Sequence, residues 1–482
     1  MLAYRSDFVL RVVHSLFPPD AVRPALLLLF CATLGICTSV SQTFTRWQQR
    51  EFTLGTFWDP PYDPELQQFE RDSASFAMAK NAHFNLLTGT QDFFAINRTF
   101  EGNAYALRLA SSVGLQYLVT DERFFPAHRK GFSKKKASVL VNQYRSLPTH
   151  VRRAMYGYNL ADEPEYSIAQ YRRLQAWMKF IEQEDPQKLA YYNLVASYAP
   201  SYKWGGFESG DQKIDLDPAE QEEYEQYCSL YVDSLRPKVV SFDHYPFFAD
   251  GRIRPDYFYN LNVMRRRAGS RPFWAYPMTV DHLTYVNPGP SHLRFMYFCP
   301  IAYGAKGLIV FTFWQPKIKE YREAIVDLEG NPTSKYDVIK ELNLYVSRLL
   351  GPLVMEQPHR RIHHASSFPD QQNVYAFKPS DSRLIKEIDD GRLLVGEFGD
   401  DQVAYLLVVN KSLEDMESFE ITLRGKETSV WVGPPLEGFS ERSPLTYRTL
   451  DLDRETAWDG AVLRDGPLRG GEGKLYRVTC AY

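Results

Sequence analysis

Two adjacent carboxylates, Asp162 and Glu163, stand where an apolar segment of the chain ends at Pro164. A β-strand that stops at a proline and delivers carboxylates at its C-terminal tip is the way in which barrel enzymes present an acid to a substrate. Two close carboxyl groups also raise each other's pKa, because their ionised forms repel, and this suits a proton donor near neutral pH. Acidic residues before a proline are also typical of a helix cap, so the pair on its own leaves catalysis and capping open.

The segment that would hold this pair belongs to a series of short apolar segments, which we predict to be strands. The predicted strands are Phe52–Trp58, Phe84–Gly89, Leu115–Thr120, Met155–Leu160, Leu189–Leu194, Val239–Phe242, Phe273–Tyr276 and Leu308–Phe313. Helical patterns lie between most of them, as at Glu101–Val113, Tyr166–Gln183 and Pro218–Leu235, and Ser334–Leu350 closes the series. Strands that alternate with helices imply a parallel sheet, and eight units over about 300 residues fit a (β/α)8 TIM barrel. A doubly wound nucleotide-binding sheet fits less well, because no Gly-rich phosphate loop follows a strand.

Polar or aromatic residues follow every predicted strand, and in a barrel the C-terminal tips of the strands share one rim. In chain order these tip residues are Asp59, Thr90, Gln91, Asp92, Asp121, Glu122, Asp162, Glu163, Asn193, Asp243, His244, Tyr245, Thr279, Asp281, His282, Trp314 and Gln315. Each of them alone is explained as a helix cap, a loop residue or a core aromatic residue. Their coincidence at all the tips favours a functional site on this rim.

The sequence pattern changes after Gly351-Pro352, a pair that should end the preceding helix. Helical periodicity is absent beyond it, and short strands are predicted at Leu393–Phe398, Val403–Asn410, Ser418–Leu423 and Lys474–Cys480. An all-β C-terminal sandwich domain is therefore predicted. The predicted domains are a signal peptide or N-terminal anchor at 1–41, the barrel at 42–350 and the sandwich at 351–482.

The run from Asn159 to Pro164 (Asn-Leu-Ala-Asp-Glu-Pro) resembles the fourth-strand Asn-Glu-Pro signature of the retaining (β/α)8 glycoside hydrolases, in a variant in which Asp precedes the Glu. Other segments resemble the β-galactosidase-like branch of that clan and its secreted relatives. These segments are Phe52–Trp58, Phe242–Pro246, Tyr303–Gly307, Phe311–Trp314 and Ala324–Thr333. The resemblance covers roughly residues 52–350 and is specific for the barrel superfamily rather than for a substrate.

The resemblance implies that Glu163 is the general acid/base that protonates the leaving oxygen of a glycosidic bond. Asp162 would occupy the family's Asn position beside it, and an ionised Asp accepts hydrogen bonds but cannot donate them. The family's nucleophile is a Glu on the seventh strand. Here Phe273–Thr279 contains no carboxylate, and the next acidic residue is Asp281.

Three explanations for the second carboxylate stay open. Asp243 or Asp281 takes the role, with a bridging water and inversion of configuration. Alternatively, Asp121 or Glu122 faces Glu163 across the rim. Otherwise the protein has lost hydrolysis and only binds sugar.

We place Asp243 first among the second carboxylates because it follows an apolar strand directly and is bracketed by His244 and Tyr245. A structural acceptor at the barrel rim is the competing explanation for a buried Asp. The residues expected to contact the substrate are Asp162, Asn193, Tyr245, Trp314, Asp121 and Trp58. Tyr and Trp rings offer flat apolar faces with a polar edge, which suit sugar rings.

The overall composition agrees with a carbohydrate partner and argues against a nucleic-acid partner. The chain has 31 Tyr, 31 Phe and 8 Trp, and its 56 basic residues nearly balance its 59 acidic residues. We find no basic stripe of the kind that binds nucleic acid. No pair of histidines has the spacing of metal ligands, so we expect neither a metal nor an organic cofactor.

The N-terminal segment predicts export. Ala25–Cys37 is an apolar run of 13 residues that follows Arg5, Arg11 and Arg23. It is too short to span a bilayer comfortably and is typical of a secretory signal, with a small residue, Ser41, at the cleavage position. An uncleaved membrane anchor is the alternative.

The three cysteines beyond this leader, Cys228, Cys299 and Cys480, show neither a metal pattern nor a dense disulfide framework. Asn97 and Asn410 lie in glycosylation sequons, which matter only in a eukaryotic host. With the family resemblance, the N-terminal segment predicts a secreted or periplasmic glycoside hydrolase-like protein. A non-catalytic carbohydrate-binding protein on a degenerate glycosidase barrel is the alternative.

Overall fold

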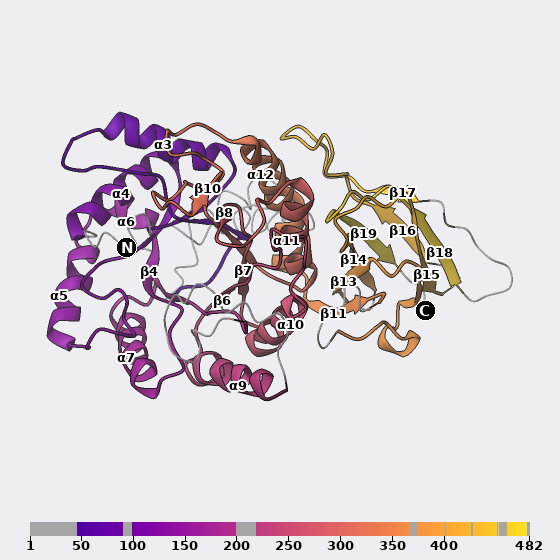
Figure 1. The fold of residues 1–482 in the computed structure, drawn as a ribbon, viewed down its shortest axis with the longest axis horizontal. Coiled ribbons are helices and arrows are strands. Elements are labelled where there is room, and N and C mark those ends of the chain that lie inside the picture. The colour runs from indigo at the N-terminus through magenta and orange to yellow at the C-terminus, as the bar shows by residue number, and fades with distance from the viewer. Residues whose placement is uncertain are drawn as a thin grey trace, which may run out of the picture. The chain divides into compact units, whose positions relative to one another are not determined.

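The computed structural model describes residues 46–89, 99–198, 218–366, 374–400, 402–425, 428–450, 452 and 460–479 (Figure 1). Eight parallel strands form one sheet in the order β5-β4-β3-β2-β1-β9-β7-β6. These strands are β1 Thr53–Phe57, β2 Leu86–Thr88, β3 Gln116–Val119, β4 Met155–Asp162, β5 Leu189–Asn193, β6 Val240–Asp243, β7 Phe273–Tyr276 and β9 Gly307–Phe311. A parallel bridge between Leu194 and Phe242 joins the two edge strands β5 and β6 and closes the sheet into a barrel. The predicted (β/α)8 barrel is therefore confirmed.

Helices alternate with these strands in the sequence and surround the barrel in Figure 1. They are α3 Phe69–Asn81, α4 Phe100–Val113, α5 Lys134–Arg145, α6 Thr149–Ala154, α7 Ile168–Glu184, α9 Pro218–Cys228, α10 Tyr257–Ala268, α11 Pro290–Ala302 and α12 Ser334–Tyr345. Local sequence explains their ends. The Thr99 hydroxyl accepts a hydrogen bond from the Gly102 amide at 3.1 Å and caps α4. Gly114 then ends the helix in the left-handed conformation, with φ of 71°.

A short antiparallel ribbon follows the seventh and eighth barrel strands, and sequence analysis did not predict it. It pairs β8, Asp281–His282, with β10, Tyr321–Arg322. Each strand has only two residues, which is too short for a recognisable alternation of polar and apolar side chains.

The helical path at the end of the barrel is longer than predicted. Helix α12 continues through a π-helical segment at Val346–Leu350 into α13, Gly351–Glu356. Pro352 is the second residue of α13. A Cβ at Gly351 would lie 2.7 Å from the Cβ of Phe52, so the glycine permits close packing rather than ending the helix.

Antiparallel strands form the C-terminal part of the chain, in two sheets. The six-stranded sheet has the order β11-β13-β14-β19-β16-β17, and the three-stranded sheet has the order β12-β15-β18. The strands are β11 His359–His364, β12 Ile385–Ile388, β13 Leu393–Gly399, β14 Val403–Asn410, β15 Phe419–Arg424, β16 Ser429–Val432, β17 Arg448–Leu450, β18 Gly460–Asp465 and β19 Gly473–Thr479, with a 3₁₀ turn at Pro379–Asp381. The predicted all-β C-terminal domain is confirmed.

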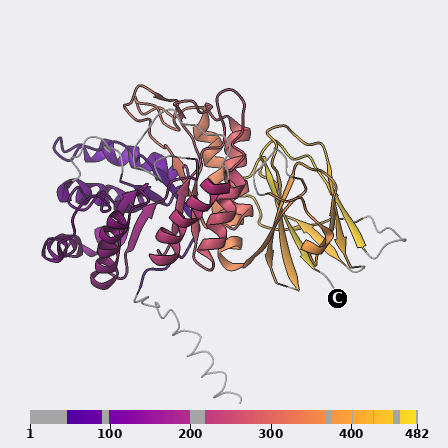
Figure 2. The same cartoon turned by 60° about the horizontal axis from the view of Figure 1, so that its bottom comes forward.

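The six-stranded sheet is covered on both faces. In β13, Leu393 and Val395 belong to the core between the two sheets, whereas Leu394 and Phe398 belong to the core shared with the barrel. Figure 2 shows helix α11 beside this sheet. A Cβ at Gly396 would lie 2.4 Å from the Ala302 carbonyl oxygen of α11, so only glycine allows this approach. Burial on both faces explains why β13 has a continuous apolar pattern rather than an alternating one.

The predictions for the N-terminal leader, for Asn97 and for Cys480 fall outside the described residues. Within the described ranges, no helix combines the length and the apolar character needed to cross a membrane. Cys228 and Cys299 are buried free thiols. Asn410 is fully buried and donates a hydrogen bond of 2.8 Å to the Glu414 carbonyl, so its side chain is inaccessible to glycosylation in the folded protein.

Candidate active site

Three carboxyl groups meet at the C-terminal mouth of the barrel. Asp162 is the last residue of β4 and Glu163 follows it, while Asp243 is the last residue of β6. Only β5 separates the two tips, because β5 pairs with β4 and the bridge after β5 joins it to β6. The side chains of Glu163 and Asp243 hydrogen-bond each other. The structure thus brings together the residues that sequence analysis proposed as acid and second carboxylate.

Asn193, at the tip of β5, bridges the two acidic tips. Its Nδ2 donates to Asp162 Oδ1 at 3.2 Å and to Asp243 Oδ1 at 2.8 Å. The Ser241 hydroxyl donates to Asn193 Oδ1 at 2.9 Å, and this bond fixes the orientation of the amide. Asn193 therefore uses both of its amide protons on carboxylates and is a positioning residue of the cluster.

The carboxyl groups have raised pKa values because Asp243 is buried, Asp162 and Glu163 are half-buried, and the three groups crowd one another. Burial, then the charges of Asp243 and Asp162, and the hydrogen bond to Asp243 raise the pKa of Glu163 well above its usual range. Burial and the Asp243 charge raise the pKa of Asp162 to about 7, against the Asn193 hydrogen bond that lowers it. Burial raises the pKa of Asp243 to about 6, although several hydrogen bonds oppose that rise. These causes favour the protonated form of Glu163, whose carboxyl group shares a hydrogen bond with that of Asp243.

Glu163 is held in an unusual backbone conformation. Its φ is 44°, in the left-handed region that residues other than glycine rarely adopt. The Glu163 amide donates to the Asn193 carbonyl at 3.0 Å, which fixes the backbone at this point. Strained backbone of this kind is concentrated at functional sites, where surrounding contacts maintain it.

Buried tyrosine hydroxyls extend the network across the barrel. The Tyr191 hydroxyl lies 2.8 Å from Ser241 Oγ and 2.7 Å from the Tyr276 hydroxyl. Tyr276 ends β7, the strand on which the family resemblance expects a Glu. Burial, then Tyr191 and Asp162, raise the pKa of Tyr276 well above 10, so its phenol stays neutral.

An aromatic wall lies beside the carboxyl groups. The Tyr245 ring stacks on Phe311 with centroids 5.4 Å apart, and it meets His282 edge-on at 5.4 Å. The His282 ring in turn stacks on Tyr321 at 5.2 Å. Burial raises the pKa of Tyr321 to about 12, and the Glu163 charge adds to that rise, so this wall lies close to the acid.

Two of the other candidate carboxylates have cationic partners of their own. Asp121 is fully buried, and its oxygens accept hydrogen bonds from Arg123 at 2.7 and 2.8 Å and from the Tyr144 hydroxyl at 2.8 Å. Asp281 forms an ion pair of 3.0 Å with Arg322 across the β8–β10 ribbon. We therefore leave both residues out of the proposed site.

The two tryptophan candidates are largely covered by protein. Trp58 and Trp314 are 8% and 7% exposed, and the Trp314 amide donates to the Trp58 carbonyl at 3.3 Å. Gly330 lies against the Trp314 ring, where an added Cβ would be 3.1 Å from the ring edge. Trp58 and Trp314 stay predictions as platforms for a sugar ring. Thr90, Gln91 and Asp92 fall outside the described residues.

His244 takes part in a structural pair. Its Nε2 lies 3.1 Å from Asp256 Oδ1, and both side chains are buried. In the part of the chain that the structure describes, no three His, Cys, Asp or Glu side chains are grouped so that they could hold a metal ion.

Sequence analysis missed the hydroxyl network, although alternation along the strands offers a signal for it. Side chains two residues apart point to the same face of a strand. Tyr191 precedes Asn193 by two residues, and Ser241 precedes Asp243 by two. The strand tips alone therefore do not define the site, because Tyr191 and Ser241, two residues before the tips, belong to the same hydrogen-bond network.

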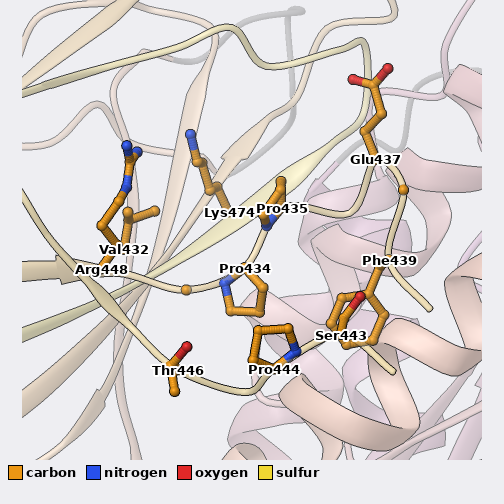
Figure 3. A pocket seen from close by; sticks show the side chains of 12 residues that line it. Val432, Pro434, Pro435, Glu437, Phe439, Ser443, Pro444, Thr446, Arg448 and Lys474 are labelled. Atoms are coloured by element: carbon orange, nitrogen blue, oxygen red, sulfur yellow. The ribbon is translucent and has the colours of Figure 1, made fainter. Parts of the chain in front are cut away.

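A cavity of about 420 Å³ lies elsewhere, in the C-terminal sandwich (Figure 3). Its lining includes Pro434, Pro435, Phe439, Pro444, Arg448 and Lys474. Lys474 already forms an ion pair of 2.8 Å with Asp465. This cavity lacks the crowded acidic groups of the barrel mouth, and we do not assign the chemistry to it.

Comparison with known proteins yields matches in structure only. No family model matches the chain, and no curated protein matches it in sequence. A glycoside hydrolase family 30 subfamily 8 xylanase from Clostridium acetobutylicum matches with a TM-score of 0.40 and 9% identity, covering 91% of this chain and 98% of the xylanase. A β-galactosidase from Bacillus circulans sp. alkalophilus has a TM-score of 0.47 and 10% identity, covering 89% and 99%.

An α-amylase from Anoxybacillus gives a TM-score of 0.48 and 8% identity, covering 90% of this chain and all of the amylase. By their descriptions these three proteins act on different carbohydrates.

Proposed function

We propose that this protein is a glycoside hydrolase in which Glu163 is the general acid and Asp243 is its hydrogen-bonded partner. The observation that carries the proposal is the direct hydrogen bond between these two carboxyl groups at the barrel mouth. Glycosidic cleavage needs a carboxylic acid that is still protonated at the working pH. Burial and the neighbouring acidic charges supply that condition for Glu163, whose pKa lies well above its usual range.

The position of the cluster also supports catalysis. Active sites of TIM barrels lie at the C-terminal ends of the strands, where Asp162, Glu163 and Asp243 meet. Asp162 and Glu163 keep partial exposure to solvent, so a substrate can reach them. The Tyr245 ring, stacked on Phe311, and the Tyr321 ring, stacked on His282, line the site beside the acid, and aromatic rings suit contact with sugars.

The test compares the wild-type protein with Glu163→Gln on a panel of aryl glycosides that have poor leaving groups. We expect kcat/KM to fall by about 10²–10⁴, the usual contribution of a general acid. Glu165→Gln is the matched control, because Glu165 lies on the same loop but pairs with Arg129 at 3.5 Å, away from the cluster. Equal turnover in the wild type and Glu163→Gln would contradict the proposal.

A carbohydrate-binding protein without catalysis is the second candidate. Two observations favour it: β7 ends in Tyr276 rather than Glu, and the Glu163–Asp243 bond is shorter than the spacing of about 5–5.5 Å in retaining glycosidases. This candidate predicts that oligosaccharides bind but that the wild type turns over none of the panel. Isothermal titration calorimetry with the same sugars separates the two functions.

We also propose that the protein acts outside the cytoplasm, on the basis of the apolar run Ala25–Cys37. N-terminal sequencing of the protein purified from its natural source tests this. A mature chain that starts near Gln42 supports the proposal, and a chain that retains residues 1–41 contradicts cleavage.

A further inference from the structure

A chain of buried hydroxyl groups crosses the seam between β5 and β6, where the barrel closes. Tyr191 lies on β5, Ser241 on β6 and Tyr276 on β7. The Tyr276 and Tyr191 hydroxyls are 2.7 Å apart, and the Tyr191 hydroxyl is 2.8 Å from Ser241 Oγ. Ser241 Oγ lies 2.9 Å from Asn193 Oδ1, and all four residues are buried. The chain therefore ends at the residue that bridges the two acidic tips.

The number of protons on these groups fixes the direction of every bond. Asn193 Nδ2 faces a carboxyl oxygen on each acidic tip, at 3.2 and 2.8 Å, so its two protons are directed to them. Asn193 Oδ1 can only accept, and Ser241 donates its single proton to it. Ser241 Oγ must then accept from Tyr191, and the Tyr191 oxygen must accept from Tyr276. The chain runs in one direction, from Tyr276 to the carboxyl groups.

This direction holds the Asn193 amide in one orientation. If the amide turned over, its oxygen would face the carboxyl groups and both donations to the acidic tips would be lost. The bonds of Ser241 and Tyr191 would also have to reverse, and the Tyr276 proton would need a new acceptor. Each bond in such a chain polarises the next, so a distant donor strengthens the last bond.

We infer that the hydroxyl groups of Tyr276, Tyr191 and Ser241 position the proposed acid. Their one-way chain fixes the Asn193 amide, which holds the carboxyl groups beside Glu163 in place. This inference rests on the proposed function of the same site. The three hydroxyl groups act through Asn193 and not on the substrate. The competing explanation is that they only join the strands where β5 meets β6.

Proton NMR of the Asn193 side chain tests the inference without a substrate. In protein labelled with ¹⁵N-asparagine, the two Asn193 amide protons are the signals that Asn193→Ala lacks. We expect Ser241→Ala, Tyr191→Phe and Tyr276→Phe to move these signals upfield, because weaker hydrogen bonds shield the protons. The movement should decrease in that order, since each variant removes a more distant donor.

Tyr192→Phe is the matched control. Tyr192 is next to Tyr191 on β5, but its hydroxyl donates to the Tyr231 carbonyl on the other face of the strand. This variant should leave the Asn193 signals unchanged. The connectivity of the chain gives a second comparison: Tyr276→Phe should move the signals in the wild type but not in protein that already carries Tyr191→Phe, where the chain is interrupted.

Kinetics then connect the chain with the acid. We expect kcat/KM on the best glycoside to fall by about threefold to tenfold in Ser241→Ala, the scale of one neutral hydrogen bond, and to stay unchanged in Tyr192→Phe. Asn193 signals that stay in place in Ser241→Ala and Tyr191→Phe, or that move as much in Tyr192→Phe, would overturn the inference. Moved signals with an unchanged kcat/KM would overturn it as well, because the chain would then serve only the fold. Absence of turnover in the wild type would contradict the proposed function, whatever the NMR signals show.

Discussion

Buried carboxyl groups in two regions of this molecule have opposite surroundings. In the sandwich, Glu397 is 4% exposed and has donors around it: His363 Nε2 and the Ser382 hydroxyl, each at 3.1 Å. Burial acts to raise its pKa, but the hydrogen bonds and His363 outweigh burial and hold the pKa below its usual range. At the barrel mouth, Glu163 faces two further carboxyl groups, and its pKa is raised.

The difference separates structural from chemical roles. A carboxylate that stabilises a fold is matched with donors or a cation, as Asp185 is matched with Arg152 and the Tyr158 hydroxyl. Among the described residues, the groups that set the pKa values of Asp162 and Glu163 include no cation. Crowding of like charges destabilises the ionised state, and such perturbed groups are concentrated where a protein performs chemistry.

The largest effect should follow from Asp243→Asn. This change removes the acceptor of the Glu163 proton and one charge that raises the pKa of Glu163. We expect kcat/KM on the best glycoside to fall by about 10²–10⁴. The alkaline limb of the pH–rate profile should move to lower pH, because Glu163 then loses its proton more easily.

Asp250→Asn provides the control, since Asp250 is exposed and pairs with Arg252 at 2.7 Å. An unchanged alkaline limb in Asp243→Asn would contradict the coupling between the two carboxyl groups.

The second change removes a hydrogen-bond donor from Glu397 in the sandwich, so that this carboxylate, like Glu163 at the barrel mouth, is no longer matched with donors. His363→Ala leaves Glu397 buried without its main donor, and removing one partner of a buried pair costs about 3 kcal/mol. We expect thermal unfolding at a clearly lower temperature, with a larger loss at about pH 8 than at about pH 5, because a more basic Glu397 resists ionisation. The kcat of the remaining folded protein should not change. A pH-independent loss would show that Glu397 keeps enough donors without His363.

A smaller effect is expected at Asn193. Its hydrogen bonds lower the pKa values of Asp162 and Asp243, so Asn193→Ala should raise both. More of the cluster is then protonated near neutral pH, and we expect about a tenfold loss of kcat/KM, the scale of one hydrogen bond to a charged group. Kinetics from about pH 5 to about pH 8 should show the acidic limb moving to higher pH. Asn262→Ala, on helix α10, is the control. A parallel loss at every pH would indicate a purely structural role.

The smallest effect concerns stability. Because the pKa values of Asp162 and Asp243 are raised to about 7 and about 6, the folded protein binds more protons than the unfolded chain above about pH 4. Stability should therefore fall as pH rises through these values. Asp162→Asn removes one of the groups that cause this fall. Between about pH 5 and about pH 8 the melting temperature of the variant should therefore decrease less than that of the wild type, and we expect the two decreases to differ by about 1–3 °C. Identical pH slopes in the two proteins would contradict the raised pKa of Asp162.

The barrel could be predicted from the sequence because each of its strands is a compact apolar segment with a clear end. The strand Phe273–Tyr276 was predicted with its observed bounds, and α4 begins one residue before the predicted Glu101. Gly351-Pro352 misled the prediction, since this pair usually breaks a helix. Here it packs against Phe52 at the start of another helix, a tertiary contact that local sequence does not contain.

The candidate site could be predicted only in part. The acidic tips at Glu163 and Asp243 are visible in the sequence, but their hydrogen bond depends on how the barrel closes between β5 and β6. In the sequence Asp121 has the same position at a strand tip, but in the structure its carboxylate accepts hydrogen bonds from Arg123 and Tyr144. Arg123 is only two residues from Asp121 in the sequence, but Tyr144 lies on helix α5, so spacing along the chain alone does not show which carboxylates are matched and which are not.

The central claim is that Glu163 keeps a proton near neutral pH, and its ionisation can be measured directly. Infrared difference spectroscopy on protein with ¹³C-labelled glutamate carboxyl groups distinguishes protonated glutamic acids from all aspartic acids. At about pH 7 we expect a labelled protonated carboxyl band in the wild type that is absent from Glu163→Gln and that disappears only at higher pH. If the wild type and Glu163→Gln gave the same spectrum at that pH, Glu163 would be ionised and could not be the general acid.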